Sequence, residues 1–295
     1  MNDWWCSSLK IRPVDDASPW FAAIPYIRKI DAAVTCRKDW EKFVQDNVLL
    51  PFIQNGTLVG NQDFDGSKYF TFIGEKTNPA VASPQLQLLR PEIVSTAGFL
   101  QIDTVKKEAK DLFQDIVAGK STSIDADMRS PLFITIAKSN HKFEEMLELF
   151  KDSKNPDESE RLMVALGYYG DSKKVLDLAL ESLIKPQDMG TLILSVARNG
   201  GDKSPLETLS WIKENQELIY EKLGTDLGAS RKIGQLIERV SASIYDAKAL
   251  KMVLEFKANE DLISDASYIT RAEATIRSNM AWQNNHGSVV CKWIS

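Results

Sequence analysis

The sequence predicts an all-α fold, a HEAT- or armadillo-like solenoid in which antiparallel helix pairs stack on one another. Apolar residues recur at helical spacing through most of the chain, in segments that open on capping residues and close on glycine or proline. No helix-length segment alternates polar and apolar residues as a half-buried strand does. The helix pairs recur about every 30 to 45 residues without a fixed motif, which favours HEAT-like over tetratricopeptide repeats.

The clearest pattern lies in residues 155–199, where three short helices can be drawn. Each helix is too short to be stable alone, so its apolar face is expected to pack against neighbouring helices. The helix boundaries are marked by residues that cap, start or break helices: Asn155, Pro156, Gly167, Asp171, Ser172, Pro186 and Gly200.

The same signals predict the remaining helices. The first opens at Pro19 with Ser18 as its cap, and Pro51 is expected to bend the second. Apolar faces at helical spacing define the others. The expected ranges are 19–30, 37–54, 84–97, 103–116, 125–140, 141–152, 204–222, 227–244, 249–259 with Asp246 as its cap, and 264–284, followed by a short terminal turn.

Residues 57–83 interrupt this pattern and are expected to be an insertion in a single domain that spans residues 1–295. Glycines punctuate the segment, and an aromatic run from Tyr69 to Ile73 crosses it, so an extended or hairpin excursion is expected. Such a run could form a surface for a partner or pack back onto the helices of its own chain. Packing onto the chain's own helices is the commoner arrangement and is favoured here.

Composition limits the function classes. Hydrophobic residues make up 43% of the chain and charged residues 26%, the balance of a soluble globular protein. A formal net charge of -5 argues against nucleic-acid binding, and no apolar stretch approaches the roughly 20 residues of a membrane span. The N-terminus lacks the pattern of a signal peptide. The cysteines, Cys6, Cys36 and Cys291, are too scattered for a disulfide framework or a zinc site, so free thiols and a cytoplasmic location are expected.

The sequence offers no catalytic residue, metal ligand or cofactor site. His141 is followed by Glu144 and Glu145 on one helix turn, but no third ligand is suggested and no His-Glu-x-x-His pair exists. His286 lies in a helix-end signature. Nucleophile-elbow, dinucleotide and Walker patterns are absent from the sequence as well. We therefore do not expect the chain to be catalytically competent alone.

Two arginines inside apolar helices are more informative. Arg198 closes the segment SVARN, and Arg239 interrupts the segment LIERV. Each could satisfy carbonyl groups at a helix C-terminus or pair with a nearby acid, which is the favoured interpretation. The functional alternative is capture of a peptide carboxylate, because a guanidinium binds a carboxylate bidentately.

A series of motifs follows in a fixed order along the chain. They are Asp15-Asp16 with Pro19-Trp20, Asp127 with Arg129, Ala165-Leu166-Gly167, Gln187-Asp188, Trp211 with Glu214-Asn215, and Ile276-Arg277 with Trp282 and Trp293. Their order and spacing resemble the C-terminal helical domain of zinc aminopeptidases of the puromycin-sensitive and endoplasmic-reticulum type. The resemblance covers most of the chain, and residues 57–83 depart from it.

The resemblance implies a domain that caps the catalytic chamber of such an enzyme and meets the far end of long peptides. In this family the zinc ion and its ligands belong to an upstream catalytic domain, whose motifs do not occur in this chain. The expected partners are therefore peptides or an aminopeptidase catalytic domain. Two alternatives stay open: a free-standing helical scaffold that binds a protein partner, and a fragment of a complete enzyme.

The resemblance also implies a third binding residue. In some family members a basic residue after the Ala-Leu-Gly helix helps to hold the peptide C-terminus, and the matching position here is Tyr168. A phenol can donate a hydrogen bond but carries no positive charge. Tyr168, Arg198 and Arg239 are thus the candidate substrate-binding residues.

Overall fold

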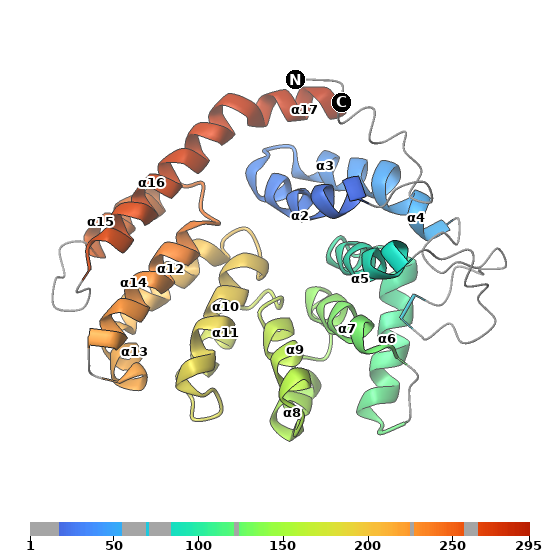
Figure 1. Cartoon of the computed structure of the whole chain (residues 1–295), viewed down its shortest axis with the longest axis horizontal. Helices are drawn as coiled ribbons and strands as arrows, with labels where there is room; N and C mark the ends of the chain where they lie inside the picture. The colour runs from blue at the N-terminus through green and yellow to red at the C-terminus, as the bar shows by residue number, and fades with distance from the viewer. Residues whose placement is uncertain (1–17, 55–68, 71–83, 121–123, 225–226, 257–264) are drawn as a thin grey trace. The chain divides into compact units, whose positions relative to one another are not determined.

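A computed structural model of the chain describes residues 18–54, 69–70, 84–120, 124–224, 227–256 and 265–295 (Figure 1). These described residues are mainly helical and contain no β-strand, which confirms the all-α prediction. None of their helices is both long and apolar enough to span a bilayer. Cys36 and Cys291 are disulfide-bonded, so the expectation of free thiols is wrong for these two residues.

The chain divides into two compact units. The first holds residues 1–142 and 293–295, and the second holds residues 143–292. The expectation of one domain over the whole chain stays a prediction. The helices of the first unit are α2 (Ser18–Ala33), α3 (Arg37–Val44), the π-helical turn η1 (Gln45–Leu49), α4 (Leu50–Gln54), α5 (Pro84–Phe99), α6 (Asp103–Val117) and α7 (Ala126–Lys138).

The predicted helix over 37–54 is interrupted by η1. Pro51 follows in the first turn of α4, where it brings no N–H to donate to the preceding turn. A π-helical turn is one of the usual ways in which a helix absorbs such a break in its hydrogen-bond ladder. The helix type thus changes just before Pro51, and the expected bend stays a prediction.

The contact between α5 and α7 in the first unit depends on a glycine. A Cβ atom built on Gly98 of α5 would lie 1.9 Å from Oγ1 of Thr135 in α7. The Thr135 hydroxyl donates to the carbonyl of Pro131 at 2.7 Å, which holds the side chain in place. Only glycine therefore permits this approach of α5 to α7.

Two residues of the predicted insertion are described, and both are in the core. Tyr69 is 3% exposed and Phe70 is 0% exposed. Their backbone N–H groups both donate to the carboxylate of Glu108 in α6, and Arg90 of α5 donates to the carbonyl of Tyr69 at 2.7 Å. These two aromatic residues therefore pack onto their own helices, as favoured above. The rest of 57–83 lies outside the described residues.

The second unit continues the helical pattern. Its helices are α8 (Phe143–Asp152), α9 (Pro156–Leu166), α10 (Ser172–Leu178), α11 (Pro186–Asn199), α12 (Ser204–Glu214), α13 (Gln216–Leu223), α14 (Leu227–Ser241), α15 (Ala247–Phe256), α16 (Ser267–Trp282), the π-helical turn η3 (Gln283–Gly287) and α17 (Ser288–Ile294), whose last two residues belong to the first unit.

Local capping explains the helix starts that the sequence predicted. The Asn155 side chain accepts from the backbone N–H of Asp157 at 2.9 Å, and the Asp171 side chain accepts from that of Lys174 at 3.1 Å. The prediction of a single helix over 204–222 is wrong, because the structure has two helices there, α12 and α13, which meet at Asn215. The Asn215 amide donates to the carbonyl of Trp211 at 2.9 Å, the local side-chain bond by which asparagine competes with helix continuation.

In the second unit, one set of neighbouring helices runs in parallel. The hydroxyl groups of Ser172 and Ser204 lie 2.7 Å apart near the starts of α10 and α12. Further along the same two helices, Trp211 Nε1 donates to Asp177 Oδ1 at 2.9 Å. Contacts at equivalent positions from start to end require parallel axes. Lysine–glutamate pairs connect α8 to α10 and α12 to α15 in the same sense.

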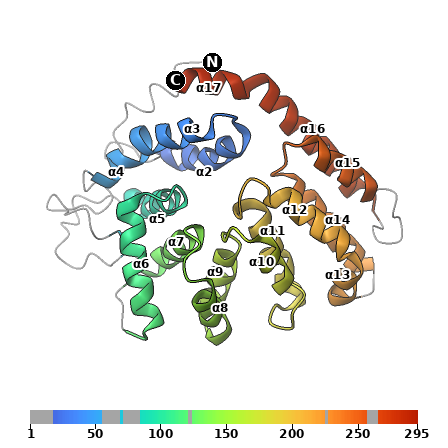
Figure 2. The ribbon, with the colours of Figure 1, turned by 180° about the vertical axis from the view of Figure 1, so that it is seen from behind.

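A second parallel set is formed by α9, α11, α14 and α16. Ser195, late in α11, donates to the carbonyl of Val164, late in α9, at 2.6 Å. Asn279, late in α16, donates to the carbonyl of Ala242 just after α14 at 3.2 Å. Helices α9, α11 and α14 follow one another in both ribbon views (Figure 1 and Figure 2). The C-terminal ends of these helices therefore lie on the same side of the second unit.

Candidate functional site

Two of the predicted binding residues come together where α11 and α14 end. Arg198 lies in the last turn of α11, and Arg239 lies in the last turn of α14, which packs beside it. Burial, and next the positive charge of Arg239, lower the pKa of the Arg198 guanidinium. An arginine still remains protonated at any physiological pH. The end of this helix pair thus carries two like charges within reach of each other.

Neither arginine is neutralised by a residue that the structure describes. No hydrogen bond or ion pair joins Arg198 or Arg239 to the described parts of the chain, although both expectations were favoured from the sequence. The side chains of Arg198 and Arg239 are both exposed, so their charges are accessible to a ligand. Among the described residues, the two arginines therefore act neither as helix caps nor as partners of an acid.

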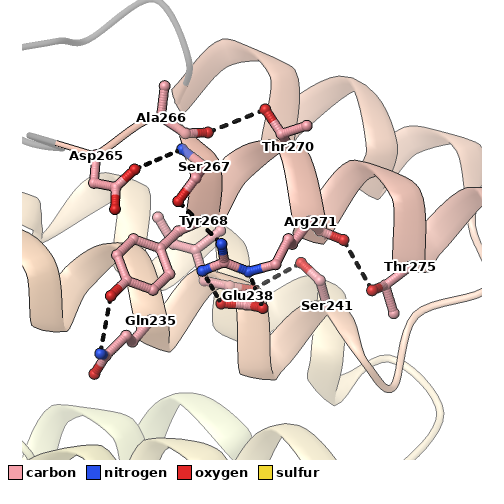
Figure 3. A network of polar contacts seen from close by, with 11 residues as sticks. Gln235, Glu238, Ser241, Asp265, Ala266, Ser267, Tyr268, Thr270, Arg271 and Thr275 are labelled. Carbon is pink, nitrogen blue, oxygen red and sulfur yellow. Dashed lines mark hydrogen bonds and ion pairs between the residues drawn. The ribbon is translucent and has the colours of Figure 1, made fainter.

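A third arginine nearby is neutralised, and the contrast is informative (Figure 3). Arg271 of α16 donates to both carboxylate oxygens of Glu238, at 2.7 Å through Nε and at 3.1 Å through Nη2. Arg271 also donates to the Ser267 hydroxyl at 3.0 Å. Glu238 precedes Arg239 on α14, but its carboxylate is committed to α16.

Aromatic stacking completes this junction of α14 and α16. The guanidinium of Arg271 lies 4.6 Å from the centre of the Tyr268 ring, and the Tyr268 hydroxyl accepts from Gln235 at 3.1 Å (Figure 3). A Cβ atom on Gly234 would lie 2.9 Å from the Tyr268 ring, so the two helices are in close contact. The junction fixes α14 on one side and so sets the position from which Arg239 extends.

Tyr168 is placed differently from the two arginines. It follows α9, and its backbone N–H donates to the carbonyl of Ala165 at 2.9 Å. It lies at the same end of the parallel set as Arg198, but only 5% of it is exposed. The structure therefore brings two predicted site residues together at the surface and places the third in the core. A role for Tyr168 in substrate binding stays a prediction.

Sequence inspection missed the Glu238–Arg271 pair. The two residues are 33 positions apart, and the sequence gives no signal that joins them. A sequence reader would pair Glu238 with a basic residue of its own helix. The structure instead leaves the adjacent Arg239 without an acid among the described residues.

A second group of charged residues lies inside the first unit. Asp31 of α2 is 5% exposed, and burial raises its pKa to about 6 against the opposing effect of Arg37. Arg37 Nε lies 3.3 Å from one Asp31 carboxylate oxygen, while the other oxygen is buried without a hydrogen-bond partner among the described residues. Burial also lowers the pKa of nearby Lys138. Such shifts occur in functional sites and in structural ion pairs alike.

The described residues contain no group of three or more histidine, cysteine, aspartate or glutamate side chains that could hold a metal ion.

A family model described as "ERAP1-like C-terminal domain" matches residues 9–278 of the chain. No curated protein matches the sequence.

Proposed function

Because the chain belongs to the family of ERAP1-like C-terminal domains, we propose that it is the substrate-binding C-terminal domain of a zinc metalloaminopeptidase. In this role it binds the C-terminal part of a peptide and leaves the chemistry to a zinc-bearing catalytic domain. The family match over residues 9–278 supports the first part of this proposal. The arginine pair supports the second.

The uncompensated pair of Arg198 and Arg239 is the observation that carries the peptide-binding role. A guanidinium donates two parallel hydrogen bonds to a carboxylate, as Arg271 does to Glu238 at 2.7 and 3.1 Å. A free peptide C-terminus offers the same carboxylate group. Tyr168 is proposed only as a neutral hydrogen-bond donor.

We also infer a HEAT-like solenoid in the second unit. The support is the division of its helices into two parallel sets, with α8, α10, α12 and α15 in one and α9, α11, α14 and α16 in the other. Stacked helix pairs of this kind produce extended concave surfaces, which solenoid proteins use for binding peptides.

The zinc ion of the proposed enzyme would be held outside the described part of this chain. The described residues provide no set of three candidate ligands, so we assign them no catalytic step. The proposed partners are a peptide and a catalytic domain. A free-standing scaffold for another protein is the alternative.

We propose an oxidising compartment in place of the cytoplasmic location predicted from the cysteine pattern. Cys36 and Cys291 are disulfide-bonded, and structural disulfides are rare in the reducing cytosol. Alkylation of the two cysteines with and without reduction tests this proposal.

The test of the proposed function is a titration of one long peptide in free-acid and C-terminally amidated forms. We expect the acid to bind roughly three- to tenfold more tightly, since a partly exposed guanidinium–carboxylate contact contributes about 1 kcal/mol. Arg198→Ala and Arg239→Ala should each reduce this difference. Arg231→Ala is the matched control, because Arg231 is an exposed arginine at an earlier position of α14.

Equal binding of the acid and the amide to the wild-type chain would remove the carboxylate role. If neither form binds to a well-folded chain, the scaffold alternative gains support. Circular dichroism of each variant shows that any lost binding does not come from unfolding.

A further inference from the structure

The charge of the Arg198–Arg239 pair exceeds what one peptide C-terminus can neutralise. We propose that the two arginines bind two carboxylates of the same ligand, so that the site prefers peptides whose last residue is glutamate or aspartate. This inference rests on the proposed function, and it adds the substrate class. The main-chain carboxylate would contact one guanidinium, and the side-chain carboxylate would contact the other.

The first argument is the number of charges. Each guanidinium presents a fork of N–H donors that fits one carboxylate bidentately. The two arginines lie in the last turns of α11 and α14, which pack together, and the positive charge of Arg239 lowers the pKa of Arg198. A ligand with one carboxylate leaves one of the two guanidinium groups without a counter-ion. A ligand with two carboxylates neutralises both guanidinium groups.

The second argument is the lack of an acid within the two helices. Asp188 is the only acidic residue of α11, and it lies in the first turn, whereas Arg198 lies in the last. Ten residues of helix separate them by about 15 Å. Glu238 is the only acidic residue of α14, and both of its oxygens are bonded to Arg271.

The third argument excludes helix capping as the reason for this arrangement. Arginine in a last helical turn is favoured by the helix dipole, and it can donate to the final carbonyl groups. Neither Arg198 nor Arg239 donates to a carbonyl of the described residues. The dipole explains why each arginine is tolerated, but it does not explain why two unpaired arginines lie together. A ligand with two anionic groups explains why the two arginines lie together.

The experiment uses four peptides that differ only at the C-terminal residue and its end group. The last residue is glutamate or glutamine, and each peptide is made as the free acid and as the amide. Glutamine has nearly the shape of glutamate without its charge. Binding to the whole chain is measured by calorimetry at low ionic strength, where surface charges are least screened.

We expect the glutamate acid to bind about three- to tenfold more tightly than the glutamine acid, the range of a partly exposed ion pair. Arg198→Gln and Arg239→Gln should each bring this ratio close to one. Arg231→Gln, the matched control on α14, should leave it unchanged. In the wild-type chain the ratio should fall as salt is added, which supports the proposal even if a variant fails to fold.

The outcomes separate the two proposals. If glutamate and glutamine acids bind equally while both bind better than their amides, the preference for an acidic last residue is wrong and the proposed function stands. If all four peptides bind equally, both are wrong. If the glutamate preference persists in the folded Arg198→Gln and Arg239→Gln variants, other residues cause the preference and the inference is overturned. Free glutarate serves as a further probe, and its competition with the glutamate peptide shows that two linked carboxylates are the recognised group.

Discussion

Arg271 and Glu238 join neighbouring helices through two nearly parallel hydrogen bonds, at 2.7 and 3.1 Å (Figure 3). The pair holds the one acidic side chain of α14 away from Arg239, its neighbour in sequence. One ion pair therefore has two effects, because it fastens α14 to α16 and leaves the arginine pair without an internal counter-ion.

The Glu238–Arg271 pair is expected to contribute little to the unfolding free energy of the chain. The Arg271 side chain is 49% exposed and that of Glu238 is 28% exposed, so Glu238→Gln should cost only about 0.5–1 kcal/mol in unfolding free energy. The preference for a free peptide carboxylate should persist, since the proposed contacts of that carboxylate are with Arg198 and Arg239. Urea unfolding and the peptide titration check both points. A loss of stability above about 3 kcal/mol would mean that the pair behaves as a buried one.

Asp31 should make the stability of the first unit depend on pH. Its pKa is raised by burial from 3.8 to about 6, so between these values the folded chain holds a proton that the unfolded chain has released. The contribution to stability is present below about pH 4 and is lost as the pH rises through about 6. A pKa shift of this size corresponds to a change in unfolding free energy on the order of 3 kcal/mol at most.

Asp31→Asn is expected to remove this pH dependence. The variant should lose less stability than the wild type when the pH rises from 4 to 7, measured by thermal or urea unfolding across that range. Asp39→Asn is the control, because Asp39 is an exposed aspartate on the neighbouring helix α3. If stability depends on pH in the same way in the wild type and in Asp31→Asn, Asp31 titrates as an ordinary carboxylate.

Short-range signals account for the part of the fold that the sequence predicted. Asn155 and Asp171 cap helices through bonds to residues two or three positions away, so their effect is visible in the sequence itself. The division at Asn215 is also local, but its apolar flanks continue the helical pattern and conceal it. Propensity and spacing alone could not decide between one helix and two.

Long-range contacts account for what the sequence could not reveal. The sequence marks Arg198 and Arg239 as separate arginines in two apolar helices, and only the packing of α11 against α14 makes them a pair. Their lack of an acid depends on Glu238 contacting a residue 33 positions away. Burial of Tyr168 likewise depends on neighbouring helices. Charge compensation and burial are properties of the assembled unit, which no local pattern determines.

The cysteines offer a direct test of the compartment. Cys36 and Cys291 are disulfide-bonded, so alkylation of the denatured but unreduced chain should leave both unmodified. Reduction before alkylation should modify both, and peptide mass spectrometry identifies the sites. The chain must be purified from its natural source with its free thiols blocked at lysis. Modification of Cys36 and Cys291 without reduction would restore the prediction of free thiols and a reducing compartment.

Gly98 should be one of the least replaceable residues of the first unit. A Cβ atom at this position would lie 1.9 Å from Thr135 Oγ1, and the short threonine side chain cannot move far because it bonds to Pro131. We expect Gly98→Ala to destabilise the chain by about 1–3 kcal/mol, the usual cost of overpacking. Gly190→Ala is the matched control. Nothing lies within 4 Å of its added Cβ atom, and alanine there should stabilise α11 by about 0.5–1 kcal/mol.

A double-mutant cycle separates the clash from a general intolerance of change at Gly98. Thr135→Ala removes the hydroxyl at 1.9 Å and the methyl group at 3.3 Å, and it leaves the Cβ atom at 3.0 Å. In that background Gly98→Ala should cost less than in the wild type, by about 0.5 kcal/mol or more. Equal costs in the two backgrounds, measured by urea unfolding, would contradict the contact between α5 and α7 described here. The expected coupling would show that Gly98 is required because Thr135 occupies the space of its missing side chain.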